Sequence, residues 1–150
     1  GTILDINGHA CVGTKGGSMN RRIKTDRAPG AIGPYSQAVA TPAQGEFLFV
    51  SGQIALDPET GEMVQKDLQA EVTQVLKNLV GVIEGAGFSV EDVVKTTILL
   101  TDMSAFGVVN DLYGAVFGAT LPARATFAVK NLPKNASVEI EAVCCRAPKL

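Results

Sequence analysis

The chain has 150 residues, of which 46% are hydrophobic and 19% charged, and its formal net charge is −2. This length favours one domain with a sizeable core, and the low charge predicts that some apolar surface meets another copy of the chain. The sequence has neither a Lys/Arg stripe nor an apolar run of about 20 residues, which argues against nucleic-acid partners and against a membrane span.

Residues 1–19 differ from the rest of the chain. They lack sustained periodicity and end in Gly-Gly-Ser-Met, so we interpret them as a disordered leader or expression-derived segment before a single domain at 20–150. The three cysteines, Cys11, Cys144 and Cys145, form no disulfide framework, which favours a reducing compartment. We expect a cytoplasmic protein, or an organellar one if residues 1–19 replace a native targeting segment.

The elements alternate in a simple order. Strands are predicted at 34–40 and 46–56, joined by the turn-rich "TPAQG". Apolar residues at helical spacing then predict a helix from Leu68 to Ile83, ended by Gly85 and Gly87. A strand at 93–102 precedes a second helix, which Asp102 or Ser104 caps and which reaches Phe117. Two strands, 123–132 and 136–144, flank the turn "PKN".

This order predicts an α+β fold in which two helices cover one face of a mixed, mostly antiparallel sheet. The other sheet face then needs a cover, and a barrel-like oligomer with its sheets turned inward provides one.

Several catalytic signatures are absent from the sequence. The only histidine, His9, lies in the leader, which excludes Ser-His and Cys-His systems from the domain. No cluster has metal-ligand spacing, and no GxGxxG follows a strand, so we predict neither a metal nor a cofactor. The chemistry is left to carboxylates, hydroxyls, backbone groups and arginine.

Arg124, in "TLPARATF", is a cation in a stretch that otherwise is typical of a strand entering a core. Its planar fork suits a small carboxylate ligand. The alternative is a structural ion pair with a strand glutamate, because a partly buried arginine needs an anion from either protein or ligand.

Five further positions could serve a site. Glu139 and Glu141 share one face of a strand with period two, as an acid/base pair or as solvated charges. Tyr35 follows Gly33-Pro34 and could reach a ligand or be a strand-edge aromatic. Gly52, in "SGQ", allows close backbone approach or marks a turn. Thr126 alone is typical of a plain strand residue.

Six stretches together resemble the RidA (YjgF) family of enamine/imine deaminases: "APGAIGPYSQAV", "FVSGQIALDPETGE", "VVKTTILLTD", "VNDLYGAVF", "LPARATF" and "LPKNASVEIEAV". The resemblance runs from Ala28 to Val143. It implies a chorismate-mutase-like fold, a homotrimer with a barrel-like core and three clefts between subunits. It also implies hydrolysis of 2-iminopropanoate and 2-iminobutanoate to 2-keto acids and ammonia without a metal or cofactor.

The resemblance also assigns roles by position. Arg124 in "PAR" matches the arginine that binds the substrate carboxylate, and Glu139 in "VEIEA" matches the glutamate that positions the attacking water. Tyr35, Ser51, Gly52 and Asn110 match residues that line or adjoin the cleft. Many members have a cysteine where this chain has Thr126. The threonine makes a covalent thiol mechanism unfavourable, although its carbonyl could accept the imine N–H.

Two alternatives remain open from the sequence. The protein could be a non-catalytic sensor that binds small carboxylic acids, since an Arg124 clamp serves either role. RNA cleavage or translation inhibition has been attributed to some relatives, but the net charge of −2 counts against it here.

Overall fold

The computed structural model describes residues 4–5 and 19–148 and has the α+β architecture expected from the sequence. Its main sheet has four strands in the order β4-β7-β5-β6. These are β4 (Glu46–Gln53), β7 (Val138–Arg146), β5 (Val93–Leu100) and β6 (Ala123–Ala128). Only the β5–β6 pair is parallel, so the sheet is mixed as predicted.

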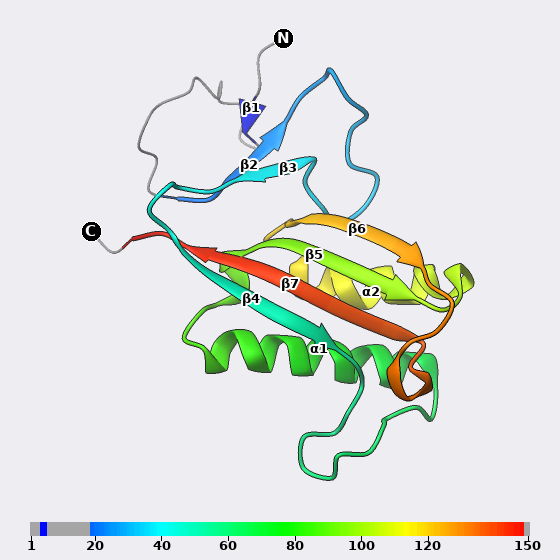
Figure 1. Ribbon diagram of the computed structural model, residues 1–150. Helices are drawn as coiled ribbons and strands as arrows, with labels where there is room; N and C mark the ends of the chain where they lie inside the picture. The colour runs from blue at the N-terminus through cyan, green and yellow to red at the C-terminus, as the bar shows by residue number, and fades with distance from the viewer. Residues whose placement is uncertain (1–3, 6–18, 149–150) are drawn as a thin grey trace.

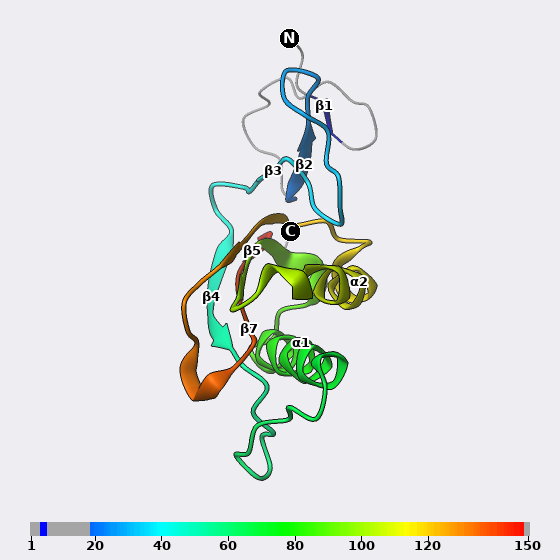
Figure 2. The same cartoon turned by 90° about the vertical axis from the view of Figure 1, so that its right-hand side faces the viewer.

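Two helices, α1 (Leu68–Gly85) and α2 (Phe106–Phe117), cover one face of this sheet (Figures 1 and 2). The Asp67 side chain caps α1 by accepting the Ala70 N–H at 2.7 Å. Gly87 follows the end of the helix and has a φ of 81°, a left-handed conformation that favours glycine. The predicted glycine stop of α1 is therefore confirmed.

The core fills the space between the helices and the sheet. The Tyr113 and Phe117 rings of α2 pack with centroids 4.7 Å apart and are fully buried. The other large side chains that are fully buried are aliphatic: Val72, Val75, Leu79, Ile83, Val93, Ile98, Leu100, Val109, Val138 and Ile140. Because burying apolar surface is the dominant favourable term in folding, this layer fixes how the sheet and helices meet. Within the described residues, no helix is both long and apolar enough to cross a bilayer.

A second, small sheet consists of β1 (Leu4–Asp5), β2 (Arg21–Lys24) and β3 (Ala38–Ala40). β2 was not predicted, because "RRIK" is short and charged. Of the strand predicted at 34–40, only the last three residues are extended, in β3. The prediction for residues 1–19 falls largely outside the described residues, although β1 pairs with β2.

Among residues 19–148, three short 3₁₀ turns complete the fold, at Val90–Asp92, Met103–Ala105 and Pro133–Asn135. Asp102 accepts the Ser104 N–H at 2.9 Å and so caps the turn that leads into α2. α2 ends at Phe117, and the turn after it closes at Leu121, which has a left-handed φ of 53° and donates its N–H to the Phe117 carbonyl at 2.8 Å. Pro122 and β6 follow at once, which places β6 beside α2.

The sheet face opposite the helices is bare in the single chain (Figure 2). Phe47 and Phe49 of β4 stack on it with centroids 6.2 Å apart and are 47% and 76% exposed. Phe127 of β6 is 49% exposed on the same face. Large apolar side chains gathered on one face are typical of a surface that meets another protein chain.

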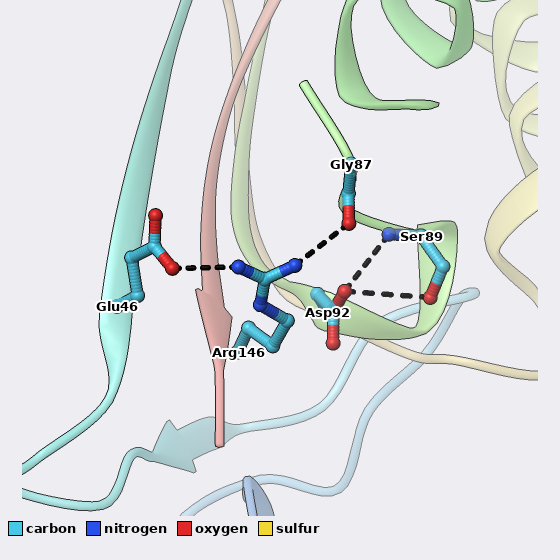
Figure 3. Close-up of polar contacts among 5 residues, drawn as sticks. All are labelled: Glu46, Gly87, Ser89, Asp92 and Arg146. Atoms are coloured by element: carbon cyan, nitrogen blue, oxygen red, sulfur yellow. Dashed lines mark hydrogen bonds and ion pairs between the residues drawn. The ribbon is translucent and has the colours of Figure 1, made fainter. Parts of the chain in front are cut away.

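One end of the sheet is held by Arg146 (Figure 3). Its guanidinium pairs with Glu46 at 2.6 Å, donates to the Gly87 carbonyl at 2.8 Å and lies 4.6 Å from the centre of the Phe88 ring. Beside it, Asp92 accepts the Ser89 N–H at 2.8 Å. These contacts join the start of β4, the end of β7 and the segment after α1.

Candidate active site

Arg124 lies on β6, the edge strand next to β5, and faces the helices. Its partner in the β5 register is Thr96, which is fully buried and shares a 2.7 Å hydrogen bond with the Tyr113 hydroxyl. The Arg124 guanidinium donates to Asn110 Oδ1 at 2.8 Å. The register of one strand and one turn of α2 therefore fix where this cation lies.

Three aromatic rings surround the same guanidinium. Its central carbon lies 5.3 Å from the Tyr35 ring centre, 5.6 Å from that of Phe106 and 5.0 Å from that of Tyr113. A cation over aromatic faces is held electrostatically without neutralising its charge. The rings thus orient the group and leave its charge available to an anion.

The electrostatics of Arg124 are those of a partly desolvated cation. Burial lowers the pKa of Arg124 from its ordinary value, while Tyr113 and Tyr35 raise it. Within the part of the chain that the structure describes, no carboxylate lies within 4.0 Å of this guanidinium. The structural ion pair with a strand glutamate is therefore not formed there.

The Tyr35 loop is anchored on both sides. The Ser36 N–H donates to the Pro122 carbonyl at 3.3 Å, and the Gln37 amide donates to the Pro29 carbonyl at 2.7 Å. The Tyr35 hydroxyl accepts the Ile32 N–H at 3.2 Å, which leaves its own proton free to donate elsewhere. At Gly33, a Cβ would lie 3.2 Å from Arg124 Nη2, so the glycine lets the loop pass close to the guanidinium.

Thr126 lies two residues after Arg124 on the same face of β6. Its register partner is Ile98, which is fully buried. Its Oγ1 is buried and has no hydrogen-bond partner among the described residues. An unpaired buried hydroxyl costs about 1–3 kcal/mol, and such groups often mark a functional position.

Glu139 lies on the opposite face of the sheet. Glu139 pairs with Leu99 of β5, whereas Arg124 pairs with Thr96 of the same strand. Positions 96 and 99 differ by an odd number, so their side chains point to opposite faces. Glu141 pairs with Thr97 on the same face as Glu139, as the strand period predicts.

Ser51 and Gly52 lie near Glu139, where β4 changes register between Val50 and Gln53. Ser51 is exposed, and the Glu139 carboxylate lies directly against Gly52. The predicted residues therefore form two groups. Tyr35, Asn110, Arg124 and Thr126 gather at α2, whereas Ser51, Gly52 and Glu139 gather on the open face. One chain does not bring the two groups into a single cleft.

The sequence analysis missed two side chains of the α2 group. Phe106 and Tyr113 lie in the predicted second helix but were not named as candidate site residues, yet both rings flank Arg124. The signal was their spacing, because Phe106, Asn110 and Tyr113 follow each other at intervals of four and three residues on one helix face.

A cavity of about 280 Å³ adjoins Tyr35 of the α2 group and is lined in part by Tyr35, Ser36 and Leu121. In the described ranges, no cluster of three or more His, Cys, Asp or Glu side chains could hold a metal ion. The groups available for chemistry here are thus a guanidinium, hydroxyls and, on the other face, a carboxylate.

By architecture, this is an α+β domain with one helix-covered and one open sheet face and a half-buried arginine on an edge strand. A sequence model of the endoribonuclease L-PSP family matches residues 25–145. The chain therefore belongs to this family, which is also known as the RidA or YjgF family.

Known relatives agree with this assignment. A 2-iminobutanoate/2-iminopropanoate deaminase of Mus musculus is 46% identical over 130 residues, which are 87% of this chain and 94% of the relative. The structure of an endoribonuclease-like protein of Thermotoga maritima has 48% identity and a TM-score of 0.68, covering 85% of this chain and 98% of that one. Escherichia coli TdcF with bound serine has 40% identity and a TM-score of 0.64, covering 84% and 98%.

Proposed function

We propose that this protein hydrolyses 2-imino acids, such as 2-iminopropanoate and 2-iminobutanoate, to 2-keto acids and ammonia. The observation that carries the proposal is the Arg124 guanidinium, which is half-buried, held by three rings and Asn110, and has no carboxylate within 4.0 Å in the described residues. Such a cation suits the carboxylate of a small substrate. Deaminases among the relatives and the serine bound to TdcF support this substrate class.

The proposed active unit is a homotrimer with a barrel-like core. The α2 group of one subunit and the Glu139 group of the next would form each cleft, because the two groups lie on opposite faces of one sheet. The exposed phenylalanines of the open face support an interface there. A head-to-tail contact of this kind closes into a ring when its rotation allows.

In the proposed mechanism, Arg124 binds the carboxylate and fixes C2 of the imino acid in the cleft. A water molecule held by Glu139 adds its oxygen to C2 and gives a proton to Glu139, while the imine nitrogen gains a proton from solvent. The tetrahedral amino alcohol is stabilised by backbone groups near Thr126 and Gly52 and by the Tyr35 hydroxyl. Glu139 returns its proton to nitrogen and the C2–N bond breaks. The C2 hydroxyl loses its proton to solvent as the carbonyl forms, so the products are ammonia and a 2-keto acid.

The test is a coupled assay. A PLP-dependent dehydratase generates the imino acids from serine and threonine, and the acceleration of ammonia release by this protein is measured. Arg124→Ala should lower kcat/KM by at least about 100-fold, because a buried charge contact to substrate is lost. Arg124→Lys keeps the charge but not the fork and should recover part of the activity. A folded Arg124→Ala variant with wild-type activity would show that the arginine is not needed.

The same assay separates the alternatives. A sensor of small carboxylates would bind 2-ketobutyrate through Arg124 without accelerating ammonia release. RNA cleavage, which the family description names, would depend on salt and on basic residues rather than on Arg124 and Glu139. Imine hydrolysis that needs both residues favours the deaminase.

A further inference from the structure

The contact between Gly52 and Glu139 is unusually close. A Cβ placed on Gly52 would lie 1.9 Å from Glu139 Oε1, 2.8 Å from its Cδ and 3.0 Å from its Cγ. Real Cβ atoms do not approach other heavy atoms below 3.0 Å, so any side chain at position 52 would displace this carboxylate. The space that Glu139 occupies exists because residue 52 has no side chain.

The backbone does not itself call for a glycine here. The glycines with positive φ in the described ranges are Gly61 and Gly87, and Gly52 is not among them. Alanine could therefore adopt the backbone conformation at position 52. The requirement for glycine at this position is one of space rather than of conformation.

The shape of β4 explains why the approach is so close. The pairing of β4 with β7 shifts register between Val50, which pairs with Ala142, and Gln53, which pairs with Ile140, so Ser51 and Gly52 form a bulge opposite the single residue Glu141. A bulge of this kind re-aims the backbone and often lies next to a functional site. Here the irregular backbone forms the surface on which the Glu139 side chain rests.

We propose that Gly52 is a positioning residue, which holds the Glu139 carboxylate in its working place by leaving room for it. This inference rests on the proposed deaminase function for its effect on turnover, whereas the contact itself can be tested without any assay of activity. It differs from a role in which the Gly52 backbone only contacts substrate. If Gly52 only lined the pocket, its substitution would weaken substrate binding. If Gly52 positions Glu139, its substitution lowers kcat and has no such effect once Glu139 is removed.

The contact is tested by a cycle of melting temperatures. Gly52→Ala should lower Tm by only about 1–2 °C, because the atoms that must move belong to the flexible end of the Glu139 side chain. In a Glu139→Ala background the obstacle is gone, so the same substitution should leave Tm unchanged or raise it. An equal drop in Tm in both backgrounds would overturn the proposal.

The functional role is tested by the same four proteins in the coupled assay. Gly52→Ala should lower kcat by about 10- to 100-fold, since a carboxylate displaced by about 1 Å loses much of its effect. Binding of 2-ketobutyrate, measured by calorimetry, should change by less than about two-fold because Arg124 is untouched. In the Glu139→Ala background, Gly52→Ala should leave kcat unchanged; a further large loss, or weakened ketobutyrate binding, would assign Gly52 to the pocket wall instead.

Gly45→Ala is the matched control. A Cβ on Gly45 would lie 2.4 Å from the Cys145 sulfur, so this variant also overpacks the sheet, but it does not meet Glu139. It should lower Tm in both backgrounds and leave kcat near the wild-type value. If wild type and Glu139→Ala release ammonia equally, the proposed function fails, whereas the melting cycle still decides whether Gly52 makes room for Glu139.

Discussion

Mixed trimers offer the sharpest prediction from the opposite placement of Arg124 and Glu139. We consider two variants, Arg124→Ala and Glu139→Ala, which are each expected to lose activity by about 100-fold or more when purified alone. They are produced together with different affinity tags, and trimers that contain both chains are isolated by two successive purifications. Their activity depends on whether one cleft draws its two groups from one chain or from two.

The magnitude follows from the geometry. If each cleft takes the arginine of one subunit and the glutamate of its neighbour, a ring with two chains of one kind and one of the other has a single intact cleft among its three. The mixed trimers should therefore show about one third of wild-type activity. If both groups came from the same chain, every cleft would lack one of them.

The assay is the coupled release of ammonia from threonine. Each variant purified alone, and the two proteins combined without subunit exchange, serve as controls. Mixed trimers that are no more active than the separate variants would refute the assignment of the site to two subunits. A protein that elutes as a monomer at assay concentration would refute it as well.

Four other predictions concern single positions. Thr126→Val removes a buried unpaired hydroxyl, so it should raise the free energy of unfolding by about 1 kcal/mol and, if the hydroxyl contacts substrate, lower turnover several-fold. Gly81→Ala, in α1 with open space for a methyl group, should stabilise the protein by about 0.5–1 kcal/mol in denaturant unfolding. Arg146→Ala should lower stability by about 1–2 kcal/mol through the loss of its contacts with Phe88 and the strand ends, without a change in kcat. Burial raises the pKa of Cys144 from 9.0 to about 11. The folded protein therefore keeps the thiol proton more tightly than the unfolded chain, so the free energy of unfolding should fall as pH rises from 9 toward 11. Cys144→Ala should reduce that fall in urea titrations at several pH values.

The long elements could be predicted because their patterns are unambiguous. α1 shows apolar residues at helical spacing over four turns, followed by the glycine stop at Gly87, and β5 is a run of β-branched and aliphatic residues. The strand at 34–40 failed in its first half because Pro34 and Tyr35 lie in a loop held by Pro122 and by the Gln37 amide. Side-chain contacts that span the sequence in this way leave no local pattern.

The division of the site could not be predicted from the sequence for a related reason. Whether Arg124 and Glu139 share a face depends on how β6 and β7 align with β5 between them, and one residue of slip would reverse the answer. The closeness of Gly52 to Glu139 depends in turn on the irregular pairing after Val50. Both facts are properties of strand pairing, whereas the residue types themselves were evident from the sequence.

The placement of the two groups on opposite sheet faces also has a consequence for inheritance, if the clefts form between subunits as proposed. When a cell makes equal amounts of wild-type chain and of chain without Arg124, each cleft depends on one donor of arginine, and about half the activity survives. When the second chain lacks both Arg124 and Glu139, each cleft needs two sound donors, and only about a quarter survives. A doubly damaged allele would thus suppress the product of its intact partner, although it makes the same amount of protein.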